Sequence, residues 1–260
     1  MRARRSRRRT PTTSQSCTGT GEVTRFLGWP RRGRVRDGEC MSTMGRTEHV
    51  DTRDMKAVHA GLLREFGGLP DLVTTASTER VPAVAGHARL LLDILEHHHS
   101  GEDRLLLPKL VERCGAQLTE SLGTAERQHR EIHAGIENAE AALARWERQP
   151  TAEAARPLAA HLRDLHRALA EHLETEEREL LPLAARHLTP AEWHELGASG
   201  AAALPKRLAP MVFGMLTADA PPDVTALMLT AVPAAPRLLL RLTATRSYAR
   251  YRRRILGPVA

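Results

Sequence analysis

The sequence predicts an all-α protein: an up-down-up-down four-helix bundle made of two similar helix pairs, with a helical extension after it. Across residues 52–188, apolar residues recur three and four positions apart, and β-branched residues are rare. The breaks between these periodic stretches are short, which favours antiparallel neighbours. The pattern His-x-x-x-Glu-x-Arg-x-Leu-Leu-Pro also occurs twice, beginning at His98 and again at His172. Together these observations predict a bundle with internal pseudo-twofold symmetry.

Four long helices are expected, and local signals mark their ends. The expected ranges are 50–75, 82–113, 120–148 and 152–188. Gly-Gly-Leu-Pro at residues 67–70 predicts a kink in the first helix, Gly115 predicts a loop, and Thr151 is suited to cap the fourth helix. Pro108 and Pro182 lie within helical stretches, where proline removes a donor and crowds the carbonyl four residues earlier. We therefore expect two helices to bend or end at these prolines.

The charge is distributed unevenly along the chain. The formal net charge is +7, yet residues 1–44 carry eleven Arg against three acidic residues, and residues 237–254 carry seven Arg and no acid. The central part is therefore acidic. Arg-rich ends are compatible with nucleic acid or anionic lipid, but no nucleic-acid-binding motif accompanies them. We expect solvated tails and no specific nucleic-acid partner.

The domain organisation follows from these patterns. Residues 1–44 lack apolar periodicity, which predicts a disordered Arg-rich segment. No apolar h-region follows the charged start, so a secretory signal is not expected, and translation could begin at Met1, Met41 or Met44. Residues 45–200 are assigned to the bundle and residues 201–260 to a C-terminal helical extension with a basic tail.

The extension is rich in proline and apolar residues and ends in the basic stretch RSYARYRRRIL. We expect short helices that pack on the bundle or on a partner, either a second copy or another protein; a membrane-surface helix is the alternative. No apolar run approaches the roughly 20 residues of a transmembrane segment. Cys17, Cys40 and Cys114 are too scattered for a disulfide scaffold, so a cytoplasmic location is expected.

Histidine and glutamate residues recur at matching positions in the two helix pairs. A shift of 74 residues aligns His59 with His133, His98 with His172, and Glu102 with Glu176. Residues four apart lie about 40° apart around a helix and one turn along it, so their side chains converge. His129 and His133 have this spacing too. A single His-x-x-x-Glu is usually a surface pair, but burying so many imidazoles and carboxylates without compensation would be costly. A bound metal removes that cost.

These residues resemble the metal-binding pattern of the hemerythrin family, the HHE cation-binding domains, over about residues 50–190. The matching residues, in order, are His59, then His98 and Glu102, then His129 and His133, and then His172 with Glu176 or Glu177. The resemblance implies a non-haem centre of two iron ions with an oxo or hydroxo bridge. It implies that His59 and His98 hold one iron, that His129, His133 and His172 hold the other, and that Glu102 and Glu176 bridge them.

Several alternatives remain open at this stage. The invertebrate oxygen carriers place the last carboxylate five residues after its histidine, which corresponds to Glu177, whereas the internal repeat favours Glu176. Mixed imidazole and carboxylate ligands suit zinc and manganese as well as iron. Ferritin-like proteins use Glu-x-x-His instead; Glu96 with His99 and Glu126 with His129 have this spacing, but the repeat does not pair them, so we interpret both as chance.

The remaining histidines and one methionine have weaker patterns. His97 and His99 flank a ligand but point about 100° away from it, so we expect them at the surface. His87 and His161 lie on nearly the same face as the ligands, about three turns away, and are expected to be buried polar residues. Met55 aligns with His129 in the repeat. We expect it to leave one iron with a vacant position and to line the site where a small ligand binds.

The expected function is binding of, or reaction with, oxygen, peroxide or nitric oxide, as a carrier, sensor or scavenger in oxidative or nitrosative stress. An iron- or redox-responsive regulatory protein and a structural bundle that holds zinc are the alternatives. The pattern does not decide between reversible binding and enzymatic turnover.

Overall fold

The computed structural model describes residues 49–115 and 119–257, which belong to one compact unit, Ser42–Ala260. The expectations for residues 1–44 lie outside the described part of the chain. Its elements are α1 (Arg53–Thr75), α2 (Val81–Leu105), α3 (Leu107–Cys114), α4 (Thr119–Arg148), α5 (Ala152–Thr175), the π-helical turn η2 (Glu176–Leu180), α6 (Leu181–His187), α7 (Pro190–Ala203), α8 (Ala209–Leu216), α9 (Pro222–Thr230) and α10 (Ala234–Leu256). All are helical, which confirms the all-α class for these residues.

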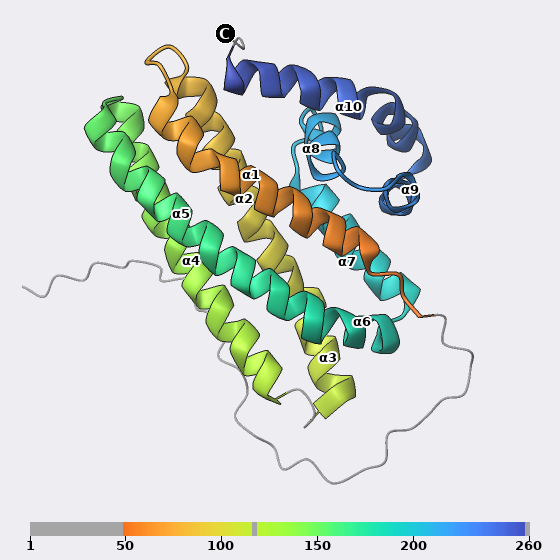
Figure 1. Cartoon of the computed structure of the whole chain (residues 1–260). Helices are drawn as coiled ribbons and strands as arrows, with labels where there is room; N and C mark the ends of the chain where they lie inside the picture. Colours follow the sequence, from red (N-terminus) through yellow and green to blue (C-terminus); the bar gives the residue numbers. More distant parts are fainter. Residues whose placement is uncertain (1–48, 116–118, 258–260) are drawn as a thin grey trace, which may run out of the picture. The chain divides into compact units, whose positions relative to one another are not determined.

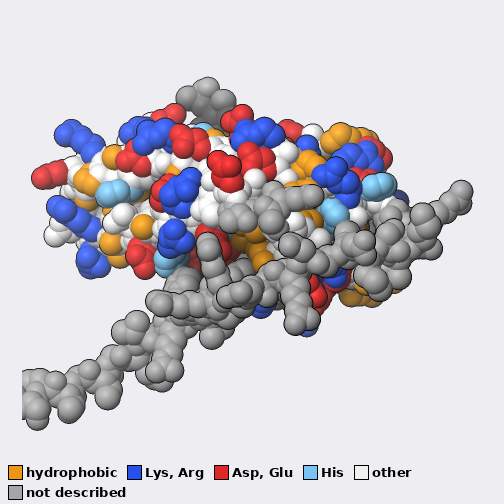
Figure 2. Space-filling view, turned by 90° about the horizontal axis from the view of Figure 1, so that it is seen from below, with side chains coloured by type: hydrophobic (Ala, Val, Ile, Leu, Met, Phe, Trp, Pro, Cys, Tyr) orange, Lys and Arg blue, Asp and Glu red, His pale blue; other side chains and the backbone are white. Residues whose placement is uncertain are grey.

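The four long helices α1, α2, α4 and α5 pack side by side around a common core (Figure 1). Contacts join α1 to α2, α2 to α4, α4 to α5 and α5 back to α1. The amphipathic pattern of each helix explains this arrangement, because its apolar face can leave water only by packing on its neighbours. Leu62, Phe66, Leu95, Ile132 and Leu169 are fully enclosed in the core. On the face seen in Figure 2, acidic and basic side chains are intermingled.

The expected helix ends are found at most of the marked positions. The Thr151 side chain accepts a hydrogen bond from the backbone N–H of Ala154 (3.2 Å) and caps α5, as predicted. Gly115, which follows α3, adopts a positive φ of 47°. Helix α1 continues through the Gly-Gly-Leu-Pro stretch and contains Pro70. The stretch for which a kink was predicted therefore lies inside a continuous helix.

The two prolines of the repeat interrupt their helices, as predicted, but in different ways. Helix α2 ends at Leu105, and Pro108 occupies the first turn of α3, where its missing N–H is not needed. Helix α5 instead widens into η2, in which the N–H of Leu181 donates to the carbonyl of Glu176, five residues back. Helix α6 then starts with Pro182 in its first turn. The π-helical turn begins at Glu176, and such turns are frequent at functional sites.

After α6, four further helices, α7–α10, pack on α1 and α2 (Figure 1). We refer to α7–α10 as the extension; it begins at Pro190, ahead of the expected residue 201. A capping box between Thr189 and Glu192 starts α7, which packs on α2. Helix α8 lies between α1 and α10. A Cβ at Gly214 would overlap the backbone of Ala244, so only glycine allows α8 and α10 to approach this closely. Among the described helices, none is both long and apolar enough to cross a bilayer.

A buried polar cluster fixes α10 to the bundle. Tyr248 donates its hydroxyl proton to Glu65 on α1 (2.5 Å), and the Tyr251 hydroxyl is hydrogen-bonded to Nδ1 of His87 on α2 (3.1 Å). His87 is almost completely buried, as expected, whereas His161 is only partly buried. Burial lowers the pKa of His87 to about 4, so this imidazole is neutral at neutral pH. The C-terminal helix is therefore held by specific polar contacts as well as by apolar packing.

Candidate metal centre

The four bundle helices bring histidine and glutamate side chains together at one level of the core. Helix α1 supplies His59, α2 supplies His98, His99 and Glu102, α4 supplies His129, and α5 with η2 supplies His172 and Glu176. All of these side chains are buried or nearly so. Helix α2 contributes more of them than any other helix. Glu102 lies about 40° around the helix from His98 and about 60° from His99, and therefore between them.

The side chains form two groups that could each hold a metal ion. The first group is His59, His98, Glu102 and Glu176, and the second is His99, Glu102, His129 and His172. In each group the candidate ligand atoms lie within 4.8 Å of one another. The two groups share a member, so the arrangement is that of two adjacent cation sites and not of one.

Two carboxylates connect the groups. Glu102 directs Oε1 toward His98 Nε2 (3.1 Å) and Oε2 toward His129 Nε2 (3.7 Å). The Oε2 atom of Glu176 lies 3.4 Å from His59 Nε2 and 3.9 Å from His172 Nε2. Each carboxylate therefore faces an imidazole of either group, which is the position of a bridging ligand.

Polar partners outside the cluster orient three of the imidazoles. His129 Nδ1 donates to Asp103 Oδ1 (2.7 Å), and His59 Nδ1 donates to Glu177 Oε1 (3.0 Å). His172 Nδ1 lies 3.3 Å from the side-chain oxygen of Gln128. An oxygen that only accepts hydrogen bonds fixes the proton on Nδ1 and leaves the lone pair of Nε2 free. Metal-binding histidines are commonly oriented in this way.

Buried polar atoms at the centre of the cluster have no hydrogen-bond partner. They include Nε2 of His59, His98 and His99, one oxygen of Glu102 and both oxygens of Glu176. Each such atom costs about 1–3 kcal/mol if it stays unsatisfied. Nitrogen and oxygen ligands lie about 2.0–2.2 Å from a transition-metal ion, which separates neighbouring ligands by about 3 Å and opposite ligands by about 4 Å. The distances of 3.1–3.9 Å between Nε2 and carboxylate oxygens therefore fit a pair of bound cations.

The electrostatics of the cluster favour a cation as well. Burial lowers the pKa of His98 and His99 far below the usual range and that of His172 to about 3. Burial raises the pKa of Glu176, and burial together with the nearby Glu176 charge raises the pKa of Glu102 strongly. These three imidazoles are thus neutral and available as ligands, while a cation would restore the ionised form of both carboxylates.

The family model of the Hemerythrin HHE cation binding domain matches residues 50–184, which is about half of the chain and contains the whole cluster. The chain belongs to the hemerythrin HHE family. No curated protein and no solved structure matches it significantly. Residues from 185 onward, including α7–α10, lie outside the HHE match.

Within this HHE domain, two histidines lie elsewhere than expected. His99, expected at the surface, is buried in the second group. His133, expected as a ligand, has a side chain that is 42% exposed and lies near Glu96 (3.1 Å) and Glu137 (3.4 Å), outside both groups. The buried Ile132 and Ile136 lie on the opposite side of His129 from His133. Helix α4 therefore turns His129 toward the core and His133 toward its rim.

The other expected site residues occupy distinct positions. Glu176 lies in the first group, whereas Glu177 lies beside it and accepts from His59. Met55 is buried one turn before His59 and lines a cavity together with His98. His97 is exposed, as expected. Asp103 and Gln128 were missed as partners of the imidazoles; the adjacency of Asp103 to Glu102 is the only sequence signal that could have indicated it.

Proposed function

We propose that this chain is a hemerythrin-like di-iron protein that binds or reacts with oxygen, peroxide or nitric oxide. The observation that carries the proposal is the pair of four-residue groups sharing Glu102, with the outer nitrogens of three imidazoles held by polar partners. Mixed imidazole and carboxylate ligands suit iron. A bound iron pair would supply electrons and a coordination position for a small oxidant.

The role of the protein in this proposal is to hold ligands and exclude water. Glu102 and Glu176 would bridge the two ions, with an oxo or hydroxo group between them. His59 and His172 are at most 1% exposed, so bulk water is largely excluded. Exclusion of water strengthens electrostatic interactions inside the site and limits side reactions.

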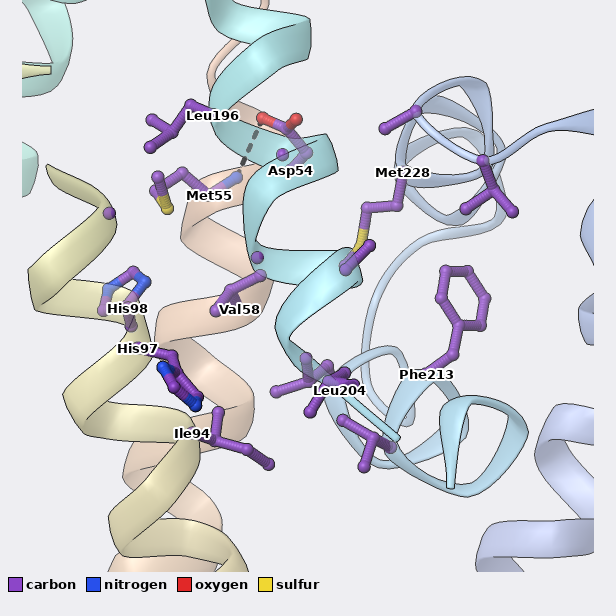
Figure 3. A pocket seen from close by; sticks show the side chains of 18 of the residues that line it. Asp54, Met55, Val58, Ile94, His97, His98, Leu196, Leu204, Phe213 and Met228 are labelled. Atoms are coloured by element: carbon purple, nitrogen blue, oxygen red, sulfur yellow. Dashed lines mark hydrogen bonds between the residues drawn. The ribbon is translucent and has the colours of Figure 1, made fainter. Parts of the chain in front are cut away.

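The two groups would give the ions unequal surroundings. The second group has three imidazoles and Glu102, whereas the first has two imidazoles, His59 and His98, with Glu102 and Glu176. If both carboxylates bridge, the ion of the first group has one protein ligand fewer. An ion with fewer protein ligands keeps a position for an exogenous molecule, as catalytic zinc sites do. We therefore propose that the small ligand binds in the first group. The buried Met55 thioether, which lies near His98 (Figure 3), would limit the size and polarity of that ligand.

We also propose a helix order, domain bounds and a cellular location for this protein. The bundle of α1, α2, α4 and α5 would have the up-down-up-down order. The domain would extend over residues 45–200, and so include most of α7, with a helical region over 201–260. We place the protein in the reducing cytoplasm because its three cysteines are scattered through the sequence.

Metal analysis and an optical titration test the proposal. The full-length protein is purified, its iron and zinc are quantified, and the reduced form is titrated with oxygen, hydrogen peroxide and nitric oxide. We expect about two irons per chain, from the two ligand groups, and a spectral change with at least one of the three molecules. Glu102→Ala, which removes the shared ligand, should lose both ions; Glu137→Ala, which changes an exposed glutamate on α4, is the matched control.

The alternatives have different outcomes. Zinc without iron would refute the di-iron assignment and favour a structural bundle. Two irons without a response to any of the three molecules would favour a regulatory protein that reports iron or redox state.

A further inference from the structure

A cavity of about 200 Å³ lies between the bundle and the C-terminal extension, next to the metal-binding cluster. Met55 and Val58 of α1 and Ile94 and His98 of α2 form one wall (Figure 3). The opposite walls come from α7, α8 and α9 of the extension, with Leu240 of α10. These opposite walls lie beyond residue 184, so the HHE match covers only the bundle side of the cavity.

The two sides of the cavity differ strongly in polarity. Its extension wall is built from apolar side chains, including Leu196, Leu204, Val212, Phe213 and Met228. No lysine or arginine is among the described residues that line it. An anionic ligand would therefore find no cationic side chain there to replace its hydration.

The polar groups of the cavity lie on the bundle side. The carboxylate of Asp54 already accepts from the indole N–H of Trp193 (3.1 Å) and from the backbone N–H of Met55 (2.9 Å). His97 and His98 are the other titratable residues of the lining. His98 also belongs to the first ligand group, where its buried Nε2 lies 3.1 Å from Glu102 Oε1. The polar part of a bound molecule would thus be placed at these two imidazoles.

We propose that this cavity binds an uncharged, apolar organic molecule with one small polar group, whose polar group faces His97 and His98. An apolar cavity with a few polar groups at one place is the usual form of a small-molecule site. The binding itself does not depend on the identity of the metal. The placement of the polar group beside a metal ligand does rest on the function proposed above.

Displacement of a neutral fluorescent probe tests this site in the full-length, metal-containing protein. N-phenyl-1-naphthylamine is bound first and is then displaced by straight-chain alcohols from butanol to octanol, and by octanoate. Each added methylene should tighten binding by about fourfold until the cavity is filled, since burying one contributes about 0.8 kcal/mol. Octanoate should bind at least about tenfold more weakly than octanol because its charge would be buried without a partner.

Two neighbouring alanines on α7 provide a matched pair of variants. Ala201 lines the cavity, whereas Ala202, which is also exposed, does not. Ala201→Phe should weaken octanol binding by tenfold or more, while Ala202→Phe should leave it unchanged. Gly200→Leu is a second blocking variant, because a Cβ at Gly200 meets no atom within 4 Å and so strains no backbone. Circular dichroism and metal content should stay the same in all three.

Three results would overturn the proposal: no saturable displacement in the wild type, octanoate binding as tightly as octanol, or equal effects of the two phenylalanine variants. Metal content measured in the same preparations separates the two proposals. A protein that binds octanol but no iron contradicts only the di-iron function, and a protein with two irons and no octanol binding contradicts only this site.

Discussion

If His99 rather than His133 is a metal ligand, the metal content of two alanine variants can be predicted quantitatively. His99 is one of three imidazoles in the second group, and its side chain is buried. His99→Ala leaves that group with two imidazoles and the shared Glu102, so its affinity should fall by more than the roughly 10- to 100-fold that loss of an outer partner causes. The first group keeps all four of its members. We therefore expect about one ion per chain instead of two.

His133→Ala is the matched variant, since it removes the same side chain from the rim of the bundle. The His133 side chain is 42% exposed, and the side chains of the nearby Glu96 and Glu137 are 47% and 68% exposed. Exposed ion pairs contribute about 0–1 kcal/mol, so metal content should stay at two and the melting temperature should hardly change. Both variants are expressed and purified in parallel, and their metal is counted by elemental analysis after identical loading. Normal content in His99→Ala, or a loss of metal in His133→Ala, would refute the ligand set derived from the structure.

Three further predictions concern residues around the centre. Asp103→Ala removes the acceptor of His129 Nδ1 and should weaken metal binding by about 10- to 100-fold; competition with a chelator measures this, and an unchanged affinity would contradict it. The pKa of His87 is lowered to about 4 in the folded protein. As the pH falls, this imidazole is therefore protonated in the unfolded chain before it is protonated in the folded chain, and the free energy of unfolding decreases from pH 6.5 downward through pH 4. Urea unfolding at pH 7 and pH 5 should show a loss of about 2 kcal/mol that His87→Gln lacks; identical pH dependence would argue against it. Met55→His should slow or abolish azide binding beside His98 with near-normal iron content, whereas an unchanged azide rate would show that Met55 does not control access.

The helices and most of the cluster were predictable from the sequence because they depend on local spacing. Apolar periodicity gave the four long helices, and the proline positions gave the breaks after α2 and α5. The four-residue spacing placed Glu102 beside His98 and Glu176 beside His172. Spacing along one helix fixes which side chains share a face, so such pairs follow without knowledge of the tertiary structure.

The identity of the second-group ligands was not predictable in the same way. Helix α2 contacts α1, α4, α7 and α10, so its buried arc is wide enough to enclose both His98 and His99. Single-helix periodicity cannot show how many neighbours a helix will have. The same limit applies to the contact between Glu65 and Tyr248, which are 183 residues apart, and to the cavity, whose walls come from α1, α2 and the extension.

Departures from the internal repeat explain why the centre is asymmetric. The shift of 74 residues pairs His59 with His133 and His99 with Leu173, yet only His59 and His99 join the cluster. Helix α2 therefore supplies an extra imidazole that α5 lacks, and this imidazole completes the second group. The first group gains nothing in return, because Met55 stands where the repeat has His129. Its His98 also borders the apolar cavity under the extension. The side of the centre with fewer imidazoles is thus the side that faces the cavity, where a bound molecule could reach it.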